Sequence, residues 1–170
     1  QSSYFDMFPG VWRHGDWVKI TSDGGVIISG RSDTTLNRQG VRIGTAEIYR
    51  AVDKIPEIKD SIIVNIELPN GGDYMPLFVI MQPGKSLTPA IINDINLQIR
   101  HHCSPRHVPD EIFEVPDIPY TISGKKMEAP VKKILMGKPI TKAANLGAMR
   151  NPESLHYFAT FAGEMLRKQN

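Results

Sequence analysis

The segment SIIVNIELPNGGDYMPLFVIM, residues 61–81, carries the clearest fold signal in this 170-residue chain. Two apolar runs, 61–66 and 77–81, stand on either side of a turn segment at 68–73 that contains Pro, Asn and two glycines. Short runs rich in β-branched and aromatic residues, bounded by such turn residues, are typical of strands joined by a turn. The sequence therefore predicts two neighbouring antiparallel strands in the middle of the chain.

Helical patterns flank this strand pair on both sides. Before it, apolar residues recur at the spacing of one buried helix face, at Ile48, Ala51, Val52 and Ile55. Thr45 is expected to cap the first turn of this helix, and Pro56 to end it. After the strands, Thr88 and Pro89 form an N-cap and first-turn pair that opens a second helix.

The remaining elements complete the predicted fold. Residues 17–29 predict a β-hairpin, 111–115 a third strand and 127–136 a third helix. Residues 139–152 are expected to be extended, and 155–166 to form a last helix. Strands separated by helices around a small sheet define an α+β fold, in which a small mixed sheet is flanked by helices.

Composition is that of an ordinary globular protein. A hydrophobic content of 41% supplies a core, and a net charge of +2 gives no electrostatic basis for nucleic acid as a partner. No apolar run approaches the roughly 20 residues of a membrane span, and no signal peptide is visible. The single cysteine, Cys103, excludes an internal disulfide and favours a reducing compartment such as the cytoplasm. The five histidines show no metal-binding pattern.

Lys125 is the first candidate for chemistry, at the end of the segment PYTISGK, 119–125. An ammonium group on a flexible stem suits phosphate or carboxylate oxygens. Gly124 removes steric bulk where the backbone must approach a ligand. Many Ser-Gly-Lys triplets are plain surface turns, so the triplet alone leaves both interpretations open.

Three further charged residues lie next to the predicted hairpin. Asp16 stands at its entrance, where a carboxylate can accept two hydrogen bonds from a ribose diol or can simply cap a turn. Arg31 and Asp33 follow the second strand, in a short polar joint that can act as a hinge. The alternative for these two residues is an exposed Arg–Asp pair of little energetic value.

Three more candidates follow along the chain. Gly40 allows a thin, extended ligand to pass close to the backbone, although a hairpin glycine is the simpler interpretation, and Arg42 stands two residues later. Arg100 ends the helix that begins at Thr88. It suits either a phosphate contact or the favourable placement of a cation at a helix C-terminus.

A resemblance to a known family emerges from four motifs in order: HGD at 14–16, GRSD at 30–33, GVRIGTAEI at 40–48 and SGK at 123–125. In order and spacing they resemble the C-terminal part of the adenylate-forming enzymes, which include acyl-CoA synthetases, adenylation domains of peptide synthetases, and luciferases. The resemblance covers residues 4–136. Residues 125–138 and 145–155 are similar, more narrowly, to acyl-CoA synthetases that use a short-chain keto acid.

The resemblance implies a reaction in two halves. A carboxylate attacks the α-phosphorus of ATP to give an acyl-adenylate and pyrophosphate, and the thiol of coenzyme A then attacks the acyl carbonyl and releases AMP. In the first half, Asp16 would hold the ribose hydroxyls and Arg31 would contact the nucleotide phosphate or ribose. Lys125 would bridge the carboxylate and phosphate oxygens, offsetting the repulsion of two anions.

The same resemblance assigns the remaining candidates to the second half. Asp33 matches a hinge about which the small domain turns between the two half-reactions. Gly40 would line the pantetheine channel, and Arg42 would stabilise the thioester-forming arrangement. Arg100 falls where a relative contacts the nucleotide of coenzyme A.

The implied organisation has three parts. Residues 1–32 would end a large N-terminal AMP-binding domain, 33–136 would form a small mobile C-terminal domain, and 137–170 would be a C-terminal extension. Most of the large domain, which would bind ATP with magnesium and select the acid, is missing, so this chain alone is expected to be inactive. His14 and Thr34 depart from residues common in relatives. Two alternatives stay open: a stand-alone binding module and an adenylation domain that loads a carrier protein.

Overall fold

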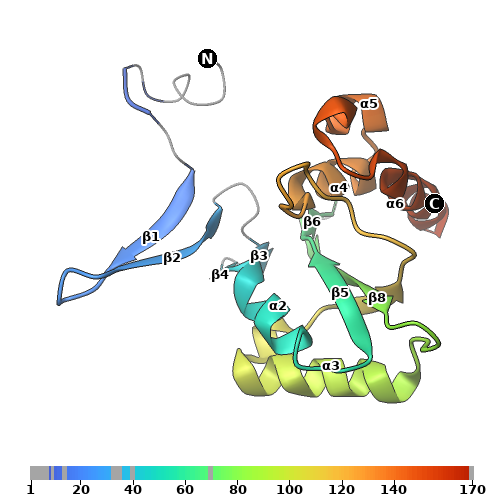
Figure 1. Ribbon diagram of the computed structural model, residues 1–170, viewed down its shortest axis with the longest axis horizontal. Coiled ribbons are helices and arrows are strands. Elements are labelled where there is room, and N and C mark those ends of the chain that lie inside the picture. The colour runs from blue at the N-terminus through green and yellow to red at the C-terminus, as the bar shows by residue number, and fades with distance from the viewer. Residues whose placement is uncertain are drawn as a thin grey trace.

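A computed structural model of the chain describes residues 8, 10–12, 15–31, 36–38, 41–68 and 71–168, without the side chains at 17, 29–31, 37, 41 and 166–168. A central sheet lies between two layers of helices, and a hairpin projects from this body (Figure 1). This confirms the predicted α+β class with a small sheet flanked by helices and a hairpin near the N-terminus.

The central sheet has three strands in the order β5 (Ile58–Ile63), β8 (Pro76–Met81) and β9 (Glu111–Glu114). β5 and β8 are antiparallel, as the sequence predicts, and β9 runs parallel to β8. Successive side chains of a strand point to opposite faces, so Leu77 and Val79 pack in one core cluster and Phe78 in the other.

One helical layer consists of α2 (Thr45–Val52) and α3 (Pro89–His102). Their predicted inner faces are buried, because Ile48 and Ile99 have no exposed surface. Thr88 caps α3 by accepting a hydrogen bond from the N–H of Ile91 at 3.3 Å. The cap predicted at Thr45 is wrong: Gly44 occupies the N-cap position without a side-chain bond, and Thr45 is already helical.

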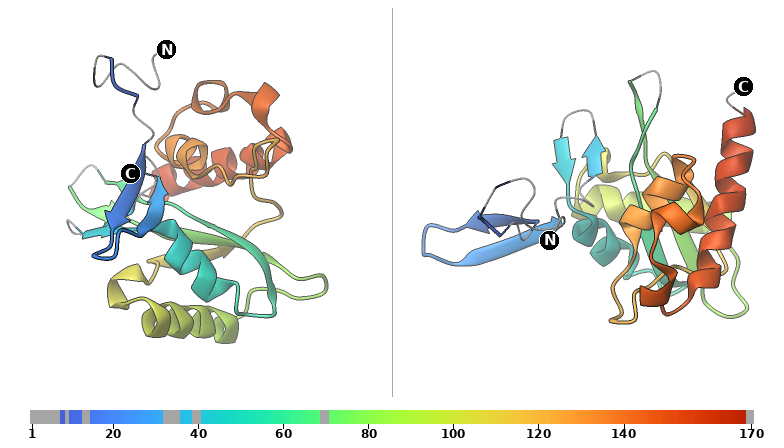
Figure 2. Two further views of the ribbon diagram at one scale, coloured as in Figure 1. Left: turned by 60° about the vertical axis from the view of Figure 1, so that its left-hand side comes forward. Right: turned by 90° about the horizontal axis from the view of Figure 1, so that it is seen from above.

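The opposite layer consists of α4 (Glu128–Leu135) and the C-terminal extension (Figure 2). The extension contains α5 (Ile140–Ala143), the 3-10 turns η2 (Leu146–Ala148) and η3 (Pro152–Ser154), and α6 (Leu155–Lys168). The last helix is confirmed, whereas the tail expected to be extended at 139–152 contains two short helical segments, α5 and η2. Phe158 of α6 meets Phe78 edge to face at 5.0 Å, so the extension shares the core of the sheet.

The strand predicted at 61–66 is divided in the structure. β5 ends at Ile63, and Ile66–Glu67 (β6) pairs with Asp73–Tyr74 (β7) in a separate ribbon. Two short strands, Leu36–Arg38 (β3) and Val41–Ile43 (β4), form a second small hairpin before α2, and the turn η1 (Pro105–His107) follows α3.

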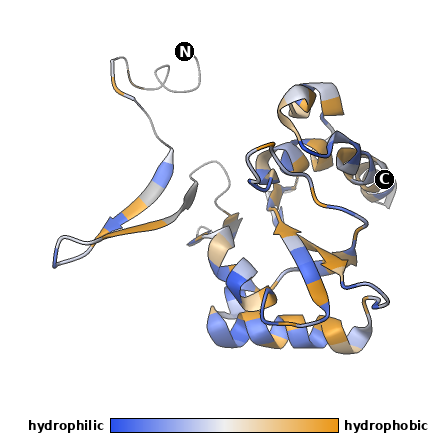
Figure 3. Cartoon of the chain, viewed as in Figure 1, coloured by the Kyte–Doolittle hydropathy of each residue, from blue (hydrophilic) through white to orange (hydrophobic). Residues whose placement is uncertain are grey.

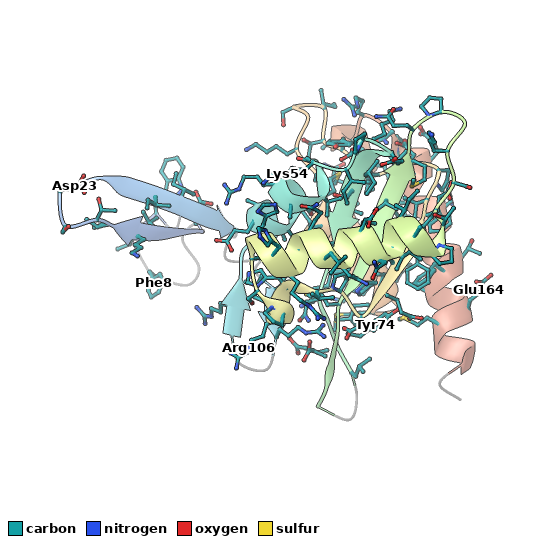
Figure 4. All side chains as sticks on the ribbon, turned by 90° about the horizontal axis from the view of Figure 1, so that it is seen from below. Phe8, Asp23, Lys54, Tyr74, Arg106 and Glu164 are labelled. Atoms are coloured by element: carbon teal, nitrogen blue, oxygen red, sulfur yellow. The ribbon has the colours of Figure 1, made fainter. Side chains whose placement is uncertain are left out.

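The predicted first hairpin is confirmed as β1 (Asp16–Ile20) paired with β2 (Val26–Arg31). Asp23 marks its tip in Figure 4, and apolar residues run along β2 in Figure 3. Ile20 is 75% exposed and Ile28 66% exposed. The hairpin therefore carries apolar surface that the rest of the described chain does not cover. None of the helices within the described ranges is long and apolar enough to cross a membrane.

Candidate active site at the lysine loop

Residues 120–126, called the lysine loop here, form a tight hairpin turn directly before α4. Tyr120 and Lys126 pair across it as an antiparallel bridge. The N–H of Thr121 donates to the carbonyl of Lys125, and the N–H of Gly124 donates to the carbonyl of Thr121, both at 2.9 Å. Gly124 has φ of 80°, a left-handed conformation that glycine adopts without strain. A Cβ at Gly124 would meet nothing within 4 Å, so within this chain the turn itself explains the glycine.

Lys125 is exposed at the end of this turn. Its backbone N–H donates to the hydroxyl of Thr121 at 2.9 Å, which fixes the main chain at this point. Within the described part of the chain, its ammonium group has no ion pair or hydrogen bond. The turn therefore presents a cation on a fixed backbone with its charge available to a ligand.

Lys126, the next residue, is held inside the body. Its Nζ lies 2.8 Å from Oδ1 of Asp60 on β5 and donates to the carbonyl of Ser61 at 2.6 Å. The hydroxyl of Tyr120 donates to Oδ2 of the same Asp60. Burial, together with the carboxylate of Asp60, raises the pKa of Tyr120, so this hydroxyl stays a donor at neutral pH. Both strands of the lysine loop are thus tied to one carboxylate of the central sheet.

Tyr49 of α2 contacts both Lys126 of the lysine loop and Glu128 at the start of α4. The ammonium of Lys126 lies 4.0 Å from the centroid of its ring. The Tyr49 hydroxyl donates to Oε1 of Glu128 at 2.9 Å and accepts from the N–H of Ile63 at 3.3 Å. Burial raises the pKa of Tyr49 well above its ordinary value, and the charge of Glu128 raises it further. The lysine loop, the sheet and α2 therefore form one connected network.

Two of the predicted nucleotide residues are brought together on the first hairpin. Asp16 begins β1, Arg31 ends β2, and the two are direct partners in the register. Asp16 is partly exposed, and the side chain of Arg31 is outside the described set. The two residues therefore occupy directly opposite positions at the same end of the hairpin.

The other predicted site residues are distributed over the body. Arg42 is exposed on β4, opposite Asn37, and Arg100 is exposed in the last turn of α3. The hinge residue Asp33 and the channel residue Gly40 both lie outside the described residues. The structure thus places Asp16 opposite Arg31 in the strand register of the first hairpin. It leaves Lys125 exposed on the lysine loop and places Arg42 and Arg100 on separate elements.

The β3–β4 hairpin, which carries Arg42, is fastened to the body by a charged pair. Both terminal nitrogens of Arg38 contact the carboxylate of Asp110, at 2.6 and 2.7 Å. Asp110 also accepts from the N–H of Met75 at 2.8 Å. Burial alone would raise the pKa of Asp110, but the hydrogen bonds and charge of Arg38 together with this N–H lower it below the ordinary value.

Sequence reasoning missed the groups that hold the lysine loop, namely Asp60, Tyr49 and Asn151. Each is far from Lys125 in sequence, and none of the four short motifs contains any of them. The structure brings them together through the sheet and the extension.

Over the described ranges, no group of three or more His, Cys, Asp or Glu side chains is arranged to hold a metal ion.

Comparison with known proteins first gives the class of protein that this chain resembles. No protein-family model matches the chain. The chain is similar to an acyl-CoA synthetase from Brucella canis, with 28% identity and a TM-score of 0.53, over 78% of this chain and 24% of that one. The fold matches the C-terminal region of adenylate-forming acyl-CoA ligases, as the motifs predict.

Within this class, the match is to acetoacetyl-CoA synthetase. The structure of the Streptomyces lividans acetoacetyl-CoA synthetase superimposes with a TM-score of 0.86 and 49% identity, over 99% of this chain and 24% of that chain. The Caenorhabditis elegans acetoacetyl-CoA synthetase is 50% identical over 163 residues, which are 95% of this chain and 23% of that protein. The chain thus matches a C-terminal part of these enzymes and spans about a quarter of their length.

Proposed function

We propose that this chain is the lysine-bearing C-terminal portion of an enzyme that activates acetoacetate with ATP and transfers it to coenzyme A. The observation that carries the proposal is Lys125, an exposed cation on a fixed turn. The identity of about half with acetoacetyl-CoA synthetases extends through the C-terminal extension and supports acetoacetate as the acid.

In the first half-reaction, an oxygen of the acetoacetate carboxylate forms a bond to the α-phosphorus of ATP, and pyrophosphate leaves. Lys125 would lie between the carboxylate and phosphate oxygens, where a fixed cation offsets the charge that builds up. Asp16 and Arg31, which face each other on the hairpin, would hold the ribose and phosphate of the nucleotide. Magnesium would be held mainly by the remainder of a longer protein.

In the second half-reaction, the sulfur of coenzyme A forms a bond to the acyl carbon, and AMP leaves. Gly40 would line the pantetheine channel, Arg42 would stabilise this arrangement and Arg100 would contact the nucleotide of coenzyme A. Rotation about Asp33 would exchange the lysine loop for the Gly40 region at the reacting centre.

The first hairpin supports a division into domains. An isolated two-stranded ribbon is marginally stable in water, and Ile20 and Ile28 are exposed on this one. Residues 1–32 therefore suit the edge of a larger N-terminal domain that covers this apolar surface. Residues 33–136 would be the mobile domain, and residues 137–170 its extension. A cytoplasmic location stays a prediction from the single cysteine.

The decisive experiment is Lys125→Ala in the full-length protein that contains this chain. Acetoacetate-dependent exchange of pyrophosphate into ATP is expected to fall by about a hundredfold or more, because the bridging cation is lost. Thioester formation from pre-made acetoacetyl-adenylate and coenzyme A is expected to survive. Lys133→Ala, at an exposed lysine of α4, is the matched control and is expected to leave both halves unchanged.

Loss of both half-reactions, or of neither, in Lys125→Ala contradicts the role given to this lysine. The same exchange assay with acetate and butyrate tests the acid separately. Faster exchange with either acid than with acetoacetate contradicts the acetoacetate assignment and leaves the role of Lys125 standing.

A further inference from the structure

Residues 148–151 of the C-terminal extension lie against the lysine loop as an additional strand. Thr121 and Met149 form an antiparallel bridge. The N–H of Ile122 donates to the carbonyl of Ala148 at 3.0 Å, and the N–H of Arg150 donates to the carbonyl of Tyr120 at 2.9 Å. The outer edge of the lysine loop is therefore paired along its length rather than open to solvent.

Asn151 closes this strand with its side chain. Its Oδ1 accepts from the N–H of Tyr120 at 2.9 Å. Its Nδ2 donates to the carbonyl of Ile118 at 2.8 Å and to the carboxylate of Asp117. Asn151 is only 9% exposed, and both ends of its amide are used. One buried side chain thus fixes three residues of the segment that leads into the lysine loop.

The strand is itself attached to the core. Met149, 6% exposed, packs in the same cluster as Leu155 and Phe158 of α6. The guanidinium of Arg150 lies 4.7 Å from the centroid of the Tyr120 ring. The lysine loop is therefore held between Asp60 of the sheet on one side and the extension on the other.

The geometry points to Asn151 as a positioning residue for Lys125, acting through the strand 148–151. Asn151 contacts the backbone of the lysine loop, and it acts on the reaction through the placement of Lys125. A turn fixed on both sides leaves only the lysine side chain to be ordered when the reactants meet, which lowers the entropic cost of reaching the reactive geometry. This inference rests on the function proposed for Lys125.

A positioning role for Asn151 predicts that its loss affects one half-reaction only. Adenylation needs Lys125 at the reacting centre, whereas thioester formation is proposed to use the region of Gly40 and Arg42. A defect in placing Lys125 therefore slows the first half-reaction and spares the second. A residue that merely stabilised the whole body would change both half-reactions together.

The test uses Asn151→Ala in the full-length protein, with Asn145→Ala as the matched control. Asn145 lies in the same extension and is exposed, and its side chain accepts from the N–H of Gly147 at 3.1 Å. We expect Asn151→Ala to slow acetoacetate-dependent pyrophosphate exchange by about tenfold or more. Thioester formation should change by less than about twofold, as should both half-reactions in Asn145→Ala.

Amide hydrogen exchange supplies a readout that does not depend on activity. The N–H groups of Tyr120 and Ile122 are expected to exchange at least about tenfold faster in Asn151→Ala, because their acceptors lie on Asn151 and on the strand it closes. Normal adenylation, equal losses in both halves, or unchanged exchange at these two amides would each overturn the inference.

A second variant covers the case in which Asn151→Ala does not fold. Arg150→Ala removes an exposed guanidinium from the ring of Tyr120 and keeps the backbone bonds. It is expected to slow adenylation selectively, by about threefold, and an unchanged or unselective result overturns the inference. Failure of the proposed function is recognised separately, because Lys125→Ala would then leave pyrophosphate exchange intact whatever Asn151→Ala does.

Discussion

Two adjacent lysines have opposite environments at the lysine loop. Lys126 is neutralised by Asp60, covered by the ring of Tyr49 and bonded to a backbone carbonyl. Lys125 is exposed on the other side of the same turn. Neighbouring residues at the end of a hairpin point in opposite directions, so one cation anchors the turn and the other is presented outward.

This difference predicts that the same substitution changes the free energy of unfolding much more at Lys126 than at Lys125. Lys126→Met should lower the free energy of unfolding by about 1–3 kcal/mol, because it removes a charged hydrogen bond from the partly buried Asp60. Lys125→Met should change it by less than about 0.5 kcal/mol. Urea denaturation of both variants measures the difference, and equal effects of the two substitutions would contradict the assigned environments.

At the scale of single elements, the β3–β4 hairpin depends on the pair formed by Arg38 and Asp110. The two residues are 72 positions apart in sequence, and the hairpin strands have only three residues each. A hairpin this short has little stability of its own, so its attachment to the body depends on packing by Leu36 and Ile43 and on this charged pair.

The lowered pKa of Asp110 gives this attachment a pH dependence. A carboxyl group with a lower pKa in the folded state stabilises that state above its unfolded pKa, near 3.8, and the contribution is lost as the pH falls through the folded value. Asp110→Asn should therefore cost about 0.5–1.5 kcal/mol at pH 7, because solvent screens this partly exposed pair, and clearly less at pH 3. Urea denaturation at both pH values measures this change.

Asp94→Asn, at an exposed position of α3, is the control for that experiment. It should change stability by less than about 0.5 kcal/mol at either pH. A cost for Asp110→Asn that is the same at pH 3 and pH 7 would show that its charge does not hold the hairpin.

The longer elements were predictable from the sequence because their patterns extend over several turns. The buried faces of α2, α3 and α4 follow the helical spacing, and the pairing of β5 with β8 follows from the turn between them. α5 and η2 were missed because they have four and three residues, too few to show a period. The break after Ile63 was missed because the apolar run continues through it.

The residues of the candidate site likewise divide into those that the sequence predicts and those that it does not. Lys125, Asp16 and Arg31 could be proposed from the sequence because each lies in a short motif. The supports of the lysine loop could not be found in this way. Asp60 and Asn151 reach Tyr120 only after the chain has folded across 60 and 31 residues, and no local pattern records such contacts.

At the scale of the whole molecule, the first hairpin and the three-layer body are joined through residues 32–35, which lie outside the described ranges. Figure 1 shows the hairpin projecting from the side of the body where β3 and β4 lie. The proposed hinge at Asp33 falls within this connection. A rotation there would move the lysine loop as part of the body, relative to Asp16 and Arg31.

Asp33→Pro in the full-length protein tests this arrangement. Proline fixes φ and should hinder the rotation, so adenylation is expected to continue while thioester formation falls by about tenfold or more. The two half-reactions are measured as for Lys125→Ala, and the expected pattern is the reverse. Asp33→Ala is the control, because it removes the carboxylate and keeps the backbone free. Normal rates of both halves in Asp33→Pro would contradict the hinge.

The aromatic contacts between the sheet and α6 constrain how this protein can change over evolution. Phe78 lies in the middle of the chain and has no exposed surface, and it meets Phe158 and Phe161 edge to face. Phe113 on the neighbouring strand meets Phe161 as well. Deleting α6 would leave these rings in water, so a lineage could lose the helix only by also replacing the aromatic residues at 78 and 113. The last helix of the chain and two strands of its central sheet therefore depend on each other for the burial of their aromatic rings.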